Sequence, residues 1–473
     1  MMSFVCRRVA LSILSATVCF CGVSRSASAS SVVVTPPSTT SCKPSLASYP
    51  TISQAVSSVP AGSTIFICPG TYAEQVVITK KLTLEGVAGN GSMGSAATGS
   101  NNPVVVSPSG GVVVNSNDLY PYGGDPNQPT AAQILVQTPS NALPTPIVVN
   151  ISNITVDGSN NGLGDCTIDL VGIYYQNASG TVNHVTTRFQ ELPPADFGCQ
   201  DGLAIYVQSG YGTGGSAVVT VENSSVHDYD KNGITADGSG TIATITGNYI
   251  VGIGATAVIA QNGIQLSDGA GGKISNNTVT DDLYINSPSC GVGSCTSATG
   301  ILLYDSGGTS GSHVAISGNT VSNTQGAIVA FTDGAATADY AGTADYNDVT
   351  SNKITTSPTA GVYFLDGIDL CSDHNTATTN SVFNSSGAGI HIDGQCKEPD
   401  ATTTGVDTVV TNNTVNEACA GVLTGPGTGA GTGNTVSGTI TYNVVATTAS
   451  GDVCPAGTPA RAKGRAKPQP RRH

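Results

Sequence analysis

The chain of 473 residues has no tryptophan, only three methionines and eight phenylalanines, and only 10% charged residues. Lysine, glutamate and leucine, which favour helices, are scarce, so a mainly helical protein is excluded. After the N-terminus, no apolar run approaches the ~20 residues that a membrane-spanning helix needs, so we expect no transmembrane segment. The shortage of aromatic side chains also argues against a broad aromatic platform for sugars.

Positive charge is almost missing from the body of the chain. All 31 acidic residues lie between residues 30 and 460, where only eight lysines and arginines occur, so this part has a net charge of −23. Such a surface repels nucleic acid, anionic lipid and polyuronates, and we expect no nucleic-acid partner. Beyond it the sign inverts, with basic residues at Arg461, Lys463, Arg465, Lys467, Arg471 and Arg472.

Residues 451–473 are predicted to form a disordered basic tail, because their charges lie among alanine, glycine and proline. The tail either keeps the protein in solution or tethers it to an acidic cell envelope. At the other end, residues 1–29 have the layout of a signal peptide. Arg7 and Arg8 precede an apolar stretch, and Ala27-Ser28-Ala29 supplies small residues for cleavage after Ala29. We therefore expect a secreted, periplasmic or cell-surface protein.

What the chain has in abundance is repetition. A pattern apolar-x-x-Asn-x-apolar recurs about every 30 residues, and one longer gap has room for two repeats. Glycine-apolar steps such as Gly233-Ile234 and Gly263-Ile264 follow the same period out of phase. Short strands separated by turns at one period predict a parallel β-helix over residues 65–450, whose asparagines stack in a column. These asparagines are Asn248, Asn277, Asn319, Asn352, Asn413 and Asn443.

The segment 30–64 is predicted to cover the open end of this solenoid. Thr51 and Gln54 form a capping box that begins a short helix. The apolar face of this helix consists of Ile52, Ala55, Val56 and Val59, at helical spacing. An amphipathic helix over the first coil would shield its edge strands and its apolar interior from solvent.

Ten cysteines follow the signal peptide, and neighbours in sequence are mostly about one coil apart. Residues one coil apart lie on top of each other, which favours disulfide bonds between them. A metal site is the rival interpretation, but no Cys-x-x-Cys pair follows residue 29. The predicted bridges are Cys42–Cys68, Cys166–Cys199, Cys290–Cys295, Cys371–Cys396 and Cys419–Cys454.

The stretch TISQAVSSVPAGSTIFICPGTYAEQVVITKKLTLEGV, residues 51–87, resembles the opening of right-handed parallel β-helix proteins of the pectin-lyase-like superfamily. The later coils resemble the repeats of that superfamily, so the likeness covers roughly residues 45–450. It implies a right-handed coil, in keeping with the handedness of parallel crossovers. It implies no active site, because the motifs of pectin methylesterases, polygalacturonases and pectate lyases do not occur here.

An aspartate follows most of the glycine-apolar steps, at Asp237, Asp268, Asp305, Asp333, Asp366 and Asp393. Three interpretations remain open. Asp-Gly is a favoured turn pair that ends a strand. Carboxylates stacked on successive coils would also suit a Ca²⁺-binding edge, formed by Asp268, Asp305, Asp333, Asp366 and Asp393. Two carboxylates on adjacent coils could instead cleave glycosidic bonds with the shorter, retaining geometry.

The coils from Gly361 to Cys396 are the predicted place for a cleft. With Ile390 and Ile392 inward, His391 faces outward. Asp366, Asp393 and His391 are the candidate catalytic residues, and Tyr363 with His391 the candidate contacts to a sugar. The alternative is a solvated surface with a hydrogen-bonded histidine.

Two classes of function follow from these patterns. The first is a non-catalytic exported β-helix that binds carbohydrate or has a structural role at the cell surface. The second is a polysaccharide-active enzyme, a lyase, glycoside hydrolase or carbohydrate esterase. Ca²⁺ is the one cofactor that the residues suggest, and extracellular polysaccharide or the cell envelope the expected partner. The sequence specifies no substrate, reaction or oligomeric state.

Overall fold

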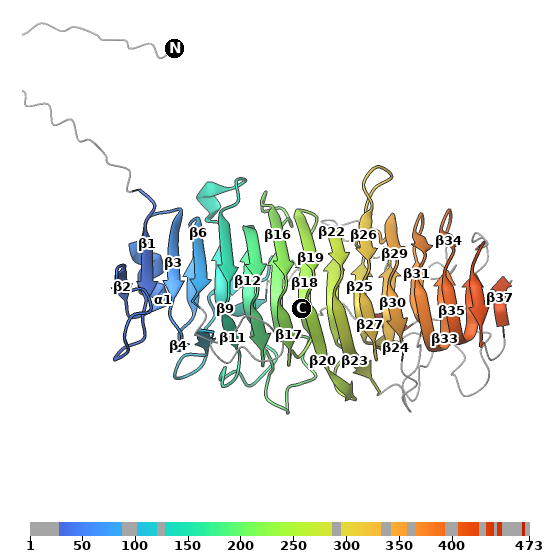
Figure 1. The fold of residues 1–473 in the computed structure, drawn as a ribbon, viewed down its shortest axis with the longest axis horizontal. Coiled ribbons are helices and arrows are strands. Elements are labelled where there is room, and N and C mark those ends of the chain that lie inside the picture. Colours follow the sequence, from blue (N-terminus) through green and yellow to red (C-terminus); the bar gives the residue numbers. More distant parts are fainter. Residues whose placement is uncertain are drawn as a thin grey trace, which may run out of the picture.

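The computed structural model shows an elongated stack of coils that runs along the long axis of the molecule (Figure 1). Nearly all strand pairings within the two large sheets are parallel, and the exception is a short antiparallel pairing of β8 (Ser116–Asn117) with β9. The predicted parallel β-helix is therefore confirmed. The structure describes residues 28–87, 102–120, 128–285, 295–332, 342–356, 366–392, 405–424, 432–438, 442–446 and 466–468.

Each regular coil contributes three strands, one to a 13-stranded sheet and two to a 23-stranded sheet. The 13-stranded sheet consists of β2 (Ala47–Tyr49), β1 (Ser31–Val34), β3 (Ser63–Ile67), β6 (Leu82–Gly86), β10 (Val148–Ser152), β13 (Ser179–Asn183), β16 (Ala217–Glu222), β19 (Thr241–Thr246), β22 (Gly271–Ser275), β26 (Val314–Ser317), β29 (Asn347–Thr350), β32 (Thr376–Thr378) and β34 (Val409–Thr411).

The 23-stranded sheet contains both the second and the third strands of the coils. The second strands of the coils are β4 (Thr71–Ala73), β7 (Val104–Val106), β11 (Thr155–Asp157), β14 (Thr186–Arg188), β17 (Ser225–His227), β20 (Tyr249–Thr256), β23 (Thr278–Tyr284), β27 (Thr320–Ser322), β30 (Lys353–Thr355), the first halves of β33 (Ser381–Ile392) and β35 (Thr414–Thr424), and β36 (Thr435–Ser437). The third strands are β5 (Val76–Ile78), β9 (Pro129–Gln137), β12 (Asp169–Gln176), β15 (Leu203–Gln208), β18 (Asn232–Asp237), β21 (Asn262–Ser267), β25 (Thr299–Tyr304), β28 (Gly326–Phe331), β31 (Ile368–Cys371), the second halves of β33 and β35, and β37 (Tyr442–Ala446).

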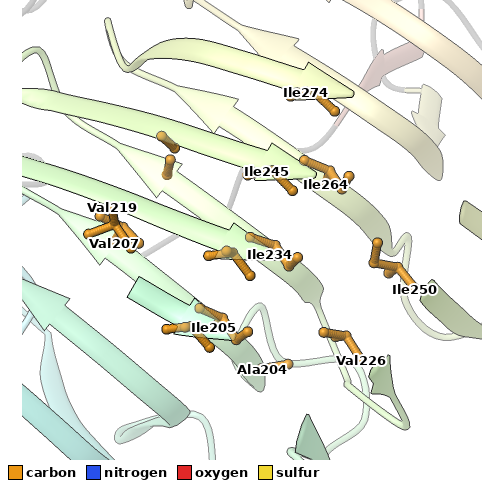
Figure 2. Packing of buried hydrophobic residues seen from close by; sticks show 14 of the residues in the cluster. Ala204, Ile205, Val207, Val219, Val226, Ile234, Ile245, Ile250, Ile264 and Ile274 are labelled. Carbon is orange, nitrogen blue, oxygen red and sulfur yellow. The ribbon is translucent and has the colours of Figure 1, made fainter. Parts of the chain in front are cut away.

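Alternate residues of all three strands point inward and form one continuous apolar core. In the first sheet the same inward position is occupied by Ile151, Val182, Val221, Ile245 and Ile274 on successive coils. Each of these side chains is fully buried, and Figure 2 shows how such isoleucines and valines of neighbouring coils pack on one another. Stacking of equivalent β-branched residues supplies the core that a solenoid cannot obtain from a central layer.

The predicted asparagine column lies in the short turn between the first and second strand of each coil. Asn248 donates from Nδ2 to Asn277 Oδ1 at 3.0 Å and to the carbonyl oxygen of Val221 at 2.9 Å. The same two bonds recur from Asn277 to Asn319 and from Asn319 to Asn352. From Asn248 onward the column is thus a continuous hydrogen-bonded ladder that satisfies buried backbone groups at each step.

The structure adds one asparagine to the predicted column and removes another. Asn380 fills the long gap, because Asn352 bonds to it and it bonds in turn to Asn413. The gap therefore holds two coils, as expected. Asn443 was wrongly assigned to the column. It lies in β37, which pairs with the second half of β35, and Asn434 occupies the last step instead.

The N-terminal end is covered, as predicted, by α1 (Ile52–Ser58). The described residues also contain a short 3₁₀ turn in another part of the chain, η1 (Ser140–Ala142). Thr51 is the N-cap and accepts from the backbone N–H of Gln54 at 3.1 Å. Glu74 supplies the second half of the cap, because its carboxylate accepts from the first two N–H groups of the helix at 2.8 Å. The predicted apolar face is buried in the core of the first coils.

Two of the five predicted disulfides are present in the described residues, Cys42–Cys68 and Cys166–Cys199. Cys371 is also disulfide-bonded, but its predicted partner Cys396 lies outside the described residues, as do Cys290 and Cys454. Cys295 and Cys419 lie in strands whose side chains are not described. Such bridges fit a protein located outside the reducing cytosol, in the extracellular space or the periplasm.

The two ends of the chain are described only in part. The predicted signal peptide falls almost wholly outside the described residues. In the predicted basic tail, β38 (Ala466–Pro468) pairs with β24 (Cys295–Ser297) as a small separate sheet. No helix among the described residues is long and apolar enough to cross a membrane.

Candidate functional site

The third strands carry the polar residues that could perform chemistry, and in several of them the second position is a glycine, as at Gly233, Gly263 and Gly300. At Gly233 a β-carbon would lie 2.5 Å from the carbonyl oxygen of Gly263 on the next coil, so no larger residue fits. This column explains the glycine-apolar steps of the sequence. Positions i and i+3 around this glycine face outward together, as shown by the 3.0 Å bond from Asn232 Nδ2 to Thr235 Oγ1.

On the first coils, this outward face carries a pair of stacked tyrosines. The rings of Tyr174 and Tyr206 are 4.8 Å apart between centroids, and both are buried. They form a small apolar cluster of their own, separate from the inner core. Their hydroxyls meet polar groups at the strand ends, where Tyr174 donates to Gln208 Oε1 at 2.6 Å.

A segment from a distant part of the chain crosses this face and closes it. The carbonyl oxygen of Asn117 accepts from Gln176 Nε2 at 2.6 Å, and the N–H of Leu119 donates to Gln208 Oε1 at 2.9 Å. Between them, Asp118 is fully buried. Its Oδ1 accepts from Gln208 Nε2 at 2.6 Å and its Oδ2 from the hydroxyl of Tyr206 at 3.2 Å.

Asp237, the last residue of β18, shares these donors and connects the buried network to the surface. Its Oδ2 accepts from Tyr206 at 3.0 Å and from Gln208 at 2.9 Å. Its Oδ1 accepts from the hydroxyl of Tyr211 at 2.8 Å and from Ser267 Oγ at 3.0 Å. Asp237 is only 3% exposed, so four donors hold its carboxyl group in one orientation.

Asp268 lies one residue after the strand that pairs with β18, and its carboxyl group is near enough to that of Asp237 to affect the pKa of that group and to be affected by it. Asp268 and Tyr211 are partly exposed, as is Tyr120, whose ring meets that of Tyr211 edge-on at 5.3 Å. The two tyrosines and Asp268 form the rim of the site, and Asp237 lies beneath them.

Burial first, and the neighbouring Asp237 charge second, raise the pKa of Asp268 well above its usual value. Burial and the charge of Asp118 raise the pKa of Asp237 in the same way. Both causes disfavour ionisation of the second carboxyl group once the first is ionised. A raised carboxyl pKa is the property that a general acid requires.

A second constellation lies on the same outward face, several coils further along. Asp366, Asp369 and His391 are all buried, and one ligand atom of each lies within 4.8 Å of the others. His391 Nδ1 is 3.3 Å from Asp366 Oδ2, and Asp366 Oδ1 accepts the N–H of Ala388 at 2.7 Å. Two carboxylates and an imidazole can bind a cation or transfer a proton.

A third feature, which the sequence did not indicate, is the buried Lys231 before β18. Its Nζ donates to the carbonyl oxygen of Ala260 at 2.6 Å. Burial lowers the pKa of Lys231 to about 7, and burial also raises the pKa of the adjacent Asp230 to about 9. Both shifts favour the uncharged forms, as expected of ionisable groups buried in an apolar interior.

The structure places the predicted site residues as follows. Ile390 and Ile392 belong to the core and His391 faces outward, as predicted, but His391 is buried rather than solvated. Asp366 and His391 converge, while Asp393, Asp333 and Tyr363 lie outside the described residues. Asp369, which belongs to the same cluster, was not among the predicted residues although it lies in the stretch proposed for a cleft.

The predicted row of six aspartates is wrong at Asp366. Asp268 and Asp305 do follow their strands, and the charge of Asp305 contributes to the raised pKa of Asp268. Asp366 instead precedes β31, at the opposite end of the strand. The glycine directly before this strand is Gly367, because the strand begins at Ile368, which is in register with Ile328. The carboxylates therefore do not form one continuous edge.

Comparisons with known proteins give likenesses of structure only. No protein-family model and no curated protein matches the sequence. Among solved structures, the A-module of mannuronan C-5 epimerase AlgE4 from Azotobacter vinelandii has a TM-score of 0.42 at 10% identity, covering 84% of this chain and 94% of that one.

Two further structures are similar at the same level. DFA-IIIase from Arthrobacter chlorophenolicus A6 without its lid has a TM-score of 0.40 at 15% identity, covering 82% of each chain. The family 28 exopolygalacturonase of Yersinia enterocolitica has a TM-score of 0.37 at 13% identity, covering 89% of this chain and 78% of that one. The fold of this protein itself rests on its parallel sheets and ladders, which make it a parallel β-helix.

Proposed function

We propose that this protein is an exported polysaccharide-active enzyme that cleaves glycosidic bonds in a neutral glycan, with the Asp237–Asp268 pair as its acid–base group. The observation that supports this proposal is the pair Asp237 and Asp268 on neighbouring coils, in which four donors orient Asp237, Asp268 is partly exposed, and burial and neighbouring charge raise the pKa of both carboxyl groups. Stacked carboxylates on neighbouring coils were one of the sequence interpretations, and the convergence of Asp237 and Asp268 favours it.

The charge of the protein indicates the class of substrate. Asp118, Asp237 and Asp268 surround the site, and burial followed by a neighbouring carboxylate has the largest influence on the pKa of Asp237 and of Asp268. A uronate chain would add further negative charge to these groups and would be repelled. A neutral glycan carries hydroxyl groups that can donate to the carboxylates, and Tyr120 and Tyr211 offer ring surface for a sugar face.

The proposed reaction is hydrolysis. Asp268, in its protonated form, donates its proton to the glycosidic oxygen as the bond to the anomeric carbon breaks. The carboxylate that remains stabilises the positive charge that develops on the sugar ring. Water adds to the anomeric carbon, and the proton it releases returns to Asp268. Tyr211 and Ser267 keep Asp237 in place throughout by donating to its Oδ1.

The test is release of reducing ends from a panel of neutral glycans, with polygalacturonate as the charged comparison. Asp268→Asn keeps the side-chain volume and suits the positive φ of 51° at this position, but it removes the proton donor. We expect it to lower activity at least ~100-fold. Asp348→Asn, on the first sheet, is the matched control and should leave activity unchanged. Wild-type activity should also fall as the pH rises and Asp268 loses its proton.

A non-catalytic binding module is the second candidate, because Asn115–Tyr120 covers the inner part of the site and leaves Asp118 fully buried. Affinity electrophoresis on the same glycans separates the two. Binding without release of reducing ends, weakened by Tyr120→Ala, would support the module and exclude the enzyme. Neither binding nor cleavage across the panel would refute both.

A further inference from the structure

We propose that Asp366, Asp369 and His391 form a binding site for a divalent transition-metal ion, with Zn²⁺ as the expected species. The three residues are 6%, 5% and 7% exposed, respectively. One ligand atom of each lies within 4.8 Å of the others. This inference is independent of the proposed function, because the Asp237–Asp268 pair lies on other coils.

The register of the third strands brings the donors together. Asp369 in β31 is the direct partner of His391 in β33, so their side chains leave the sheet one strand spacing apart on the same face. Asp366 stands three positions before Asp369, on the other side of Gly367. This is the same i and i+3 relation that places Asn232 and Thr235 together on an earlier coil. The three donors therefore converge through the repeat geometry of the fold.

The surroundings of the three donors are apolar along the stack. In the row of Asp369 and His391, the preceding coil contributes Val329 and the following coil Leu423. Val329 belongs to a buried cluster with Phe331 and Leu302, and Leu423 to one with Ala388 and Ala420. Two carboxylates in such a place are costly to ionise unless a cation compensates them, and a low dielectric strengthens their hold on that cation.

The donor types select the metal. Ca²⁺ takes six to eight oxygen ligands, whereas an imidazole nitrogen with two carboxylates suits Zn²⁺ and its neighbours in the transition series. The backbone N–H of Ala388 bonds to Asp366 Oδ1 at 2.7 Å and orients this carboxylate, as outer hydrogen bonds do at metal centres. Three protein ligands leave room for water or for a ligand group from substrate.

The test begins with the full chain, stripped of metal by a chelator and titrated with Zn²⁺, with Co²⁺ as a spectroscopic probe and with Ca²⁺ for comparison. We expect one equivalent of Zn²⁺ to bind, a Co²⁺ spectrum of low coordination number, and a rise in melting temperature with Zn²⁺. Ca²⁺ should not compete at the same concentration.

Asp369→Asn and His391→Gln should each weaken Zn²⁺ binding by at least ~10-fold, the lower bound for loss of even an outer partner. His313→Gln, a histidine that pairs with Asp348 on the first sheet, is the matched control and should bind as the wild type does. If one variant fails to fold, the Zn²⁺ affinity of the other variant and the wild-type titration still test the proposed site. Absence of stoichiometric Zn²⁺ binding, unchanged affinity in both variants, or binding of Ca²⁺ in preference would overturn the proposal.

Discussion

Replacing Asn352 with alanine measures how much the asparagine ladder stabilises the solenoid. Asn352 is 1% exposed. Its Nδ2 donates to the carbonyl oxygen of Ile316 at 2.9 Å and to Asn380 Oδ1 at 3.0 Å. Its Oδ1 accepts from the backbone N–H and from Nδ2 of Asn319, both at 2.9 Å. Alanine removes all four hydrogen bonds and fills none of the space.

The groups left behind set the magnitude. The buried N–H of Asn319 loses the bond to Asn352, and such an orphaned donor costs about 1–3 kcal/mol. Asn319 Nδ2 keeps its bond to the carbonyl oxygen of Ile274, and Asn380 Oδ1 keeps the backbone N–H of Asn352, so these groups lose less. With roughly 1 kcal/mol for the remaining lost bonds, we expect the free energy of unfolding to fall by about 3 kcal/mol.

The assay is urea unfolding followed by far-ultraviolet circular dichroism, with Asn150→Ala as the control. Asn150 is exposed in the middle of β10, so its loss should change stability by no more than ~0.5 kcal/mol. Because a long solenoid can unfold in parts, midpoints are compared only where the slopes agree. Hydrogen exchange of the peptide that contains Asn319 gives the local measurement. Equal stability of the two variants, with unchanged protection at Asn319, would refute the stabilising role of the ladder.

Two further predictions concern the third strands and their pH dependence. Gly263→Ala should destabilise the fold by ~1–3 kcal/mol, because the new β-carbon would lie 2.4 Å from Val279 Cγ1 and 2.8 Å from the carbonyl oxygen of Gly300; a variant that melts with the wild type would contradict this packing. Burial raises the pKa of Asp282 well above its usual value, so the folded protein keeps a proton that the unfolded chain releases, and stability falls as the pH rises above the unfolded pKa of ~3.9. Asp282→Asn keeps a carbonyl acceptor for Tyr229, so its stability relative to the wild type should increase from pH 5 to pH 8. Urea midpoints of both proteins at pH 5 and at pH 8 measure this, and a stability difference between variant and wild type that is equal at the two pH values would contradict the pKa shift.

The repeat could be predicted because one coil dictates the next. Stacking requires the same residue type at the same corner, so Asn277 and Asn319 are visible as a spaced pattern, and the lack of room for a β-carbon makes Gly233 and Gly263 visible too. The disulfide Cys166–Cys199 followed from the same argument, since one coil of separation puts the two residues on top of each other.

The site could not be predicted in the same way, because it depends on contacts that no repeat encodes. Asp118 reaches Tyr206 and Asp237 from a segment 88 residues before Tyr206. No repeated spacing in the sequence indicates that this segment crosses the third strands. The error at Asp366 has a different cause. Its distance from the step Gly361-Val362 predicted a position after a strand, but β31 begins only at Ile368, directly after Gly367. Only the register of Ile368 with Ile328 reveals this.

The ladder corner also governs how this architecture can be lengthened or recombined. Successive ladder asparagines are separated by as few as 21 residues, from Asn413 to Asn434, and by as many as 42, from Asn277 to Asn319. Each step nevertheless advances the stack by a single rung, so additional residues are accommodated at the other two corners. Chimeras joined at equivalent asparagines would inherit a matched core on both sides of the junction. Duplication of one coil lengthens the solenoid without changes to the neighbouring coils, because each coil contacts only its neighbours. Loops inserted between the second and third strands can vary in sequence and length while the strands keep their pairing.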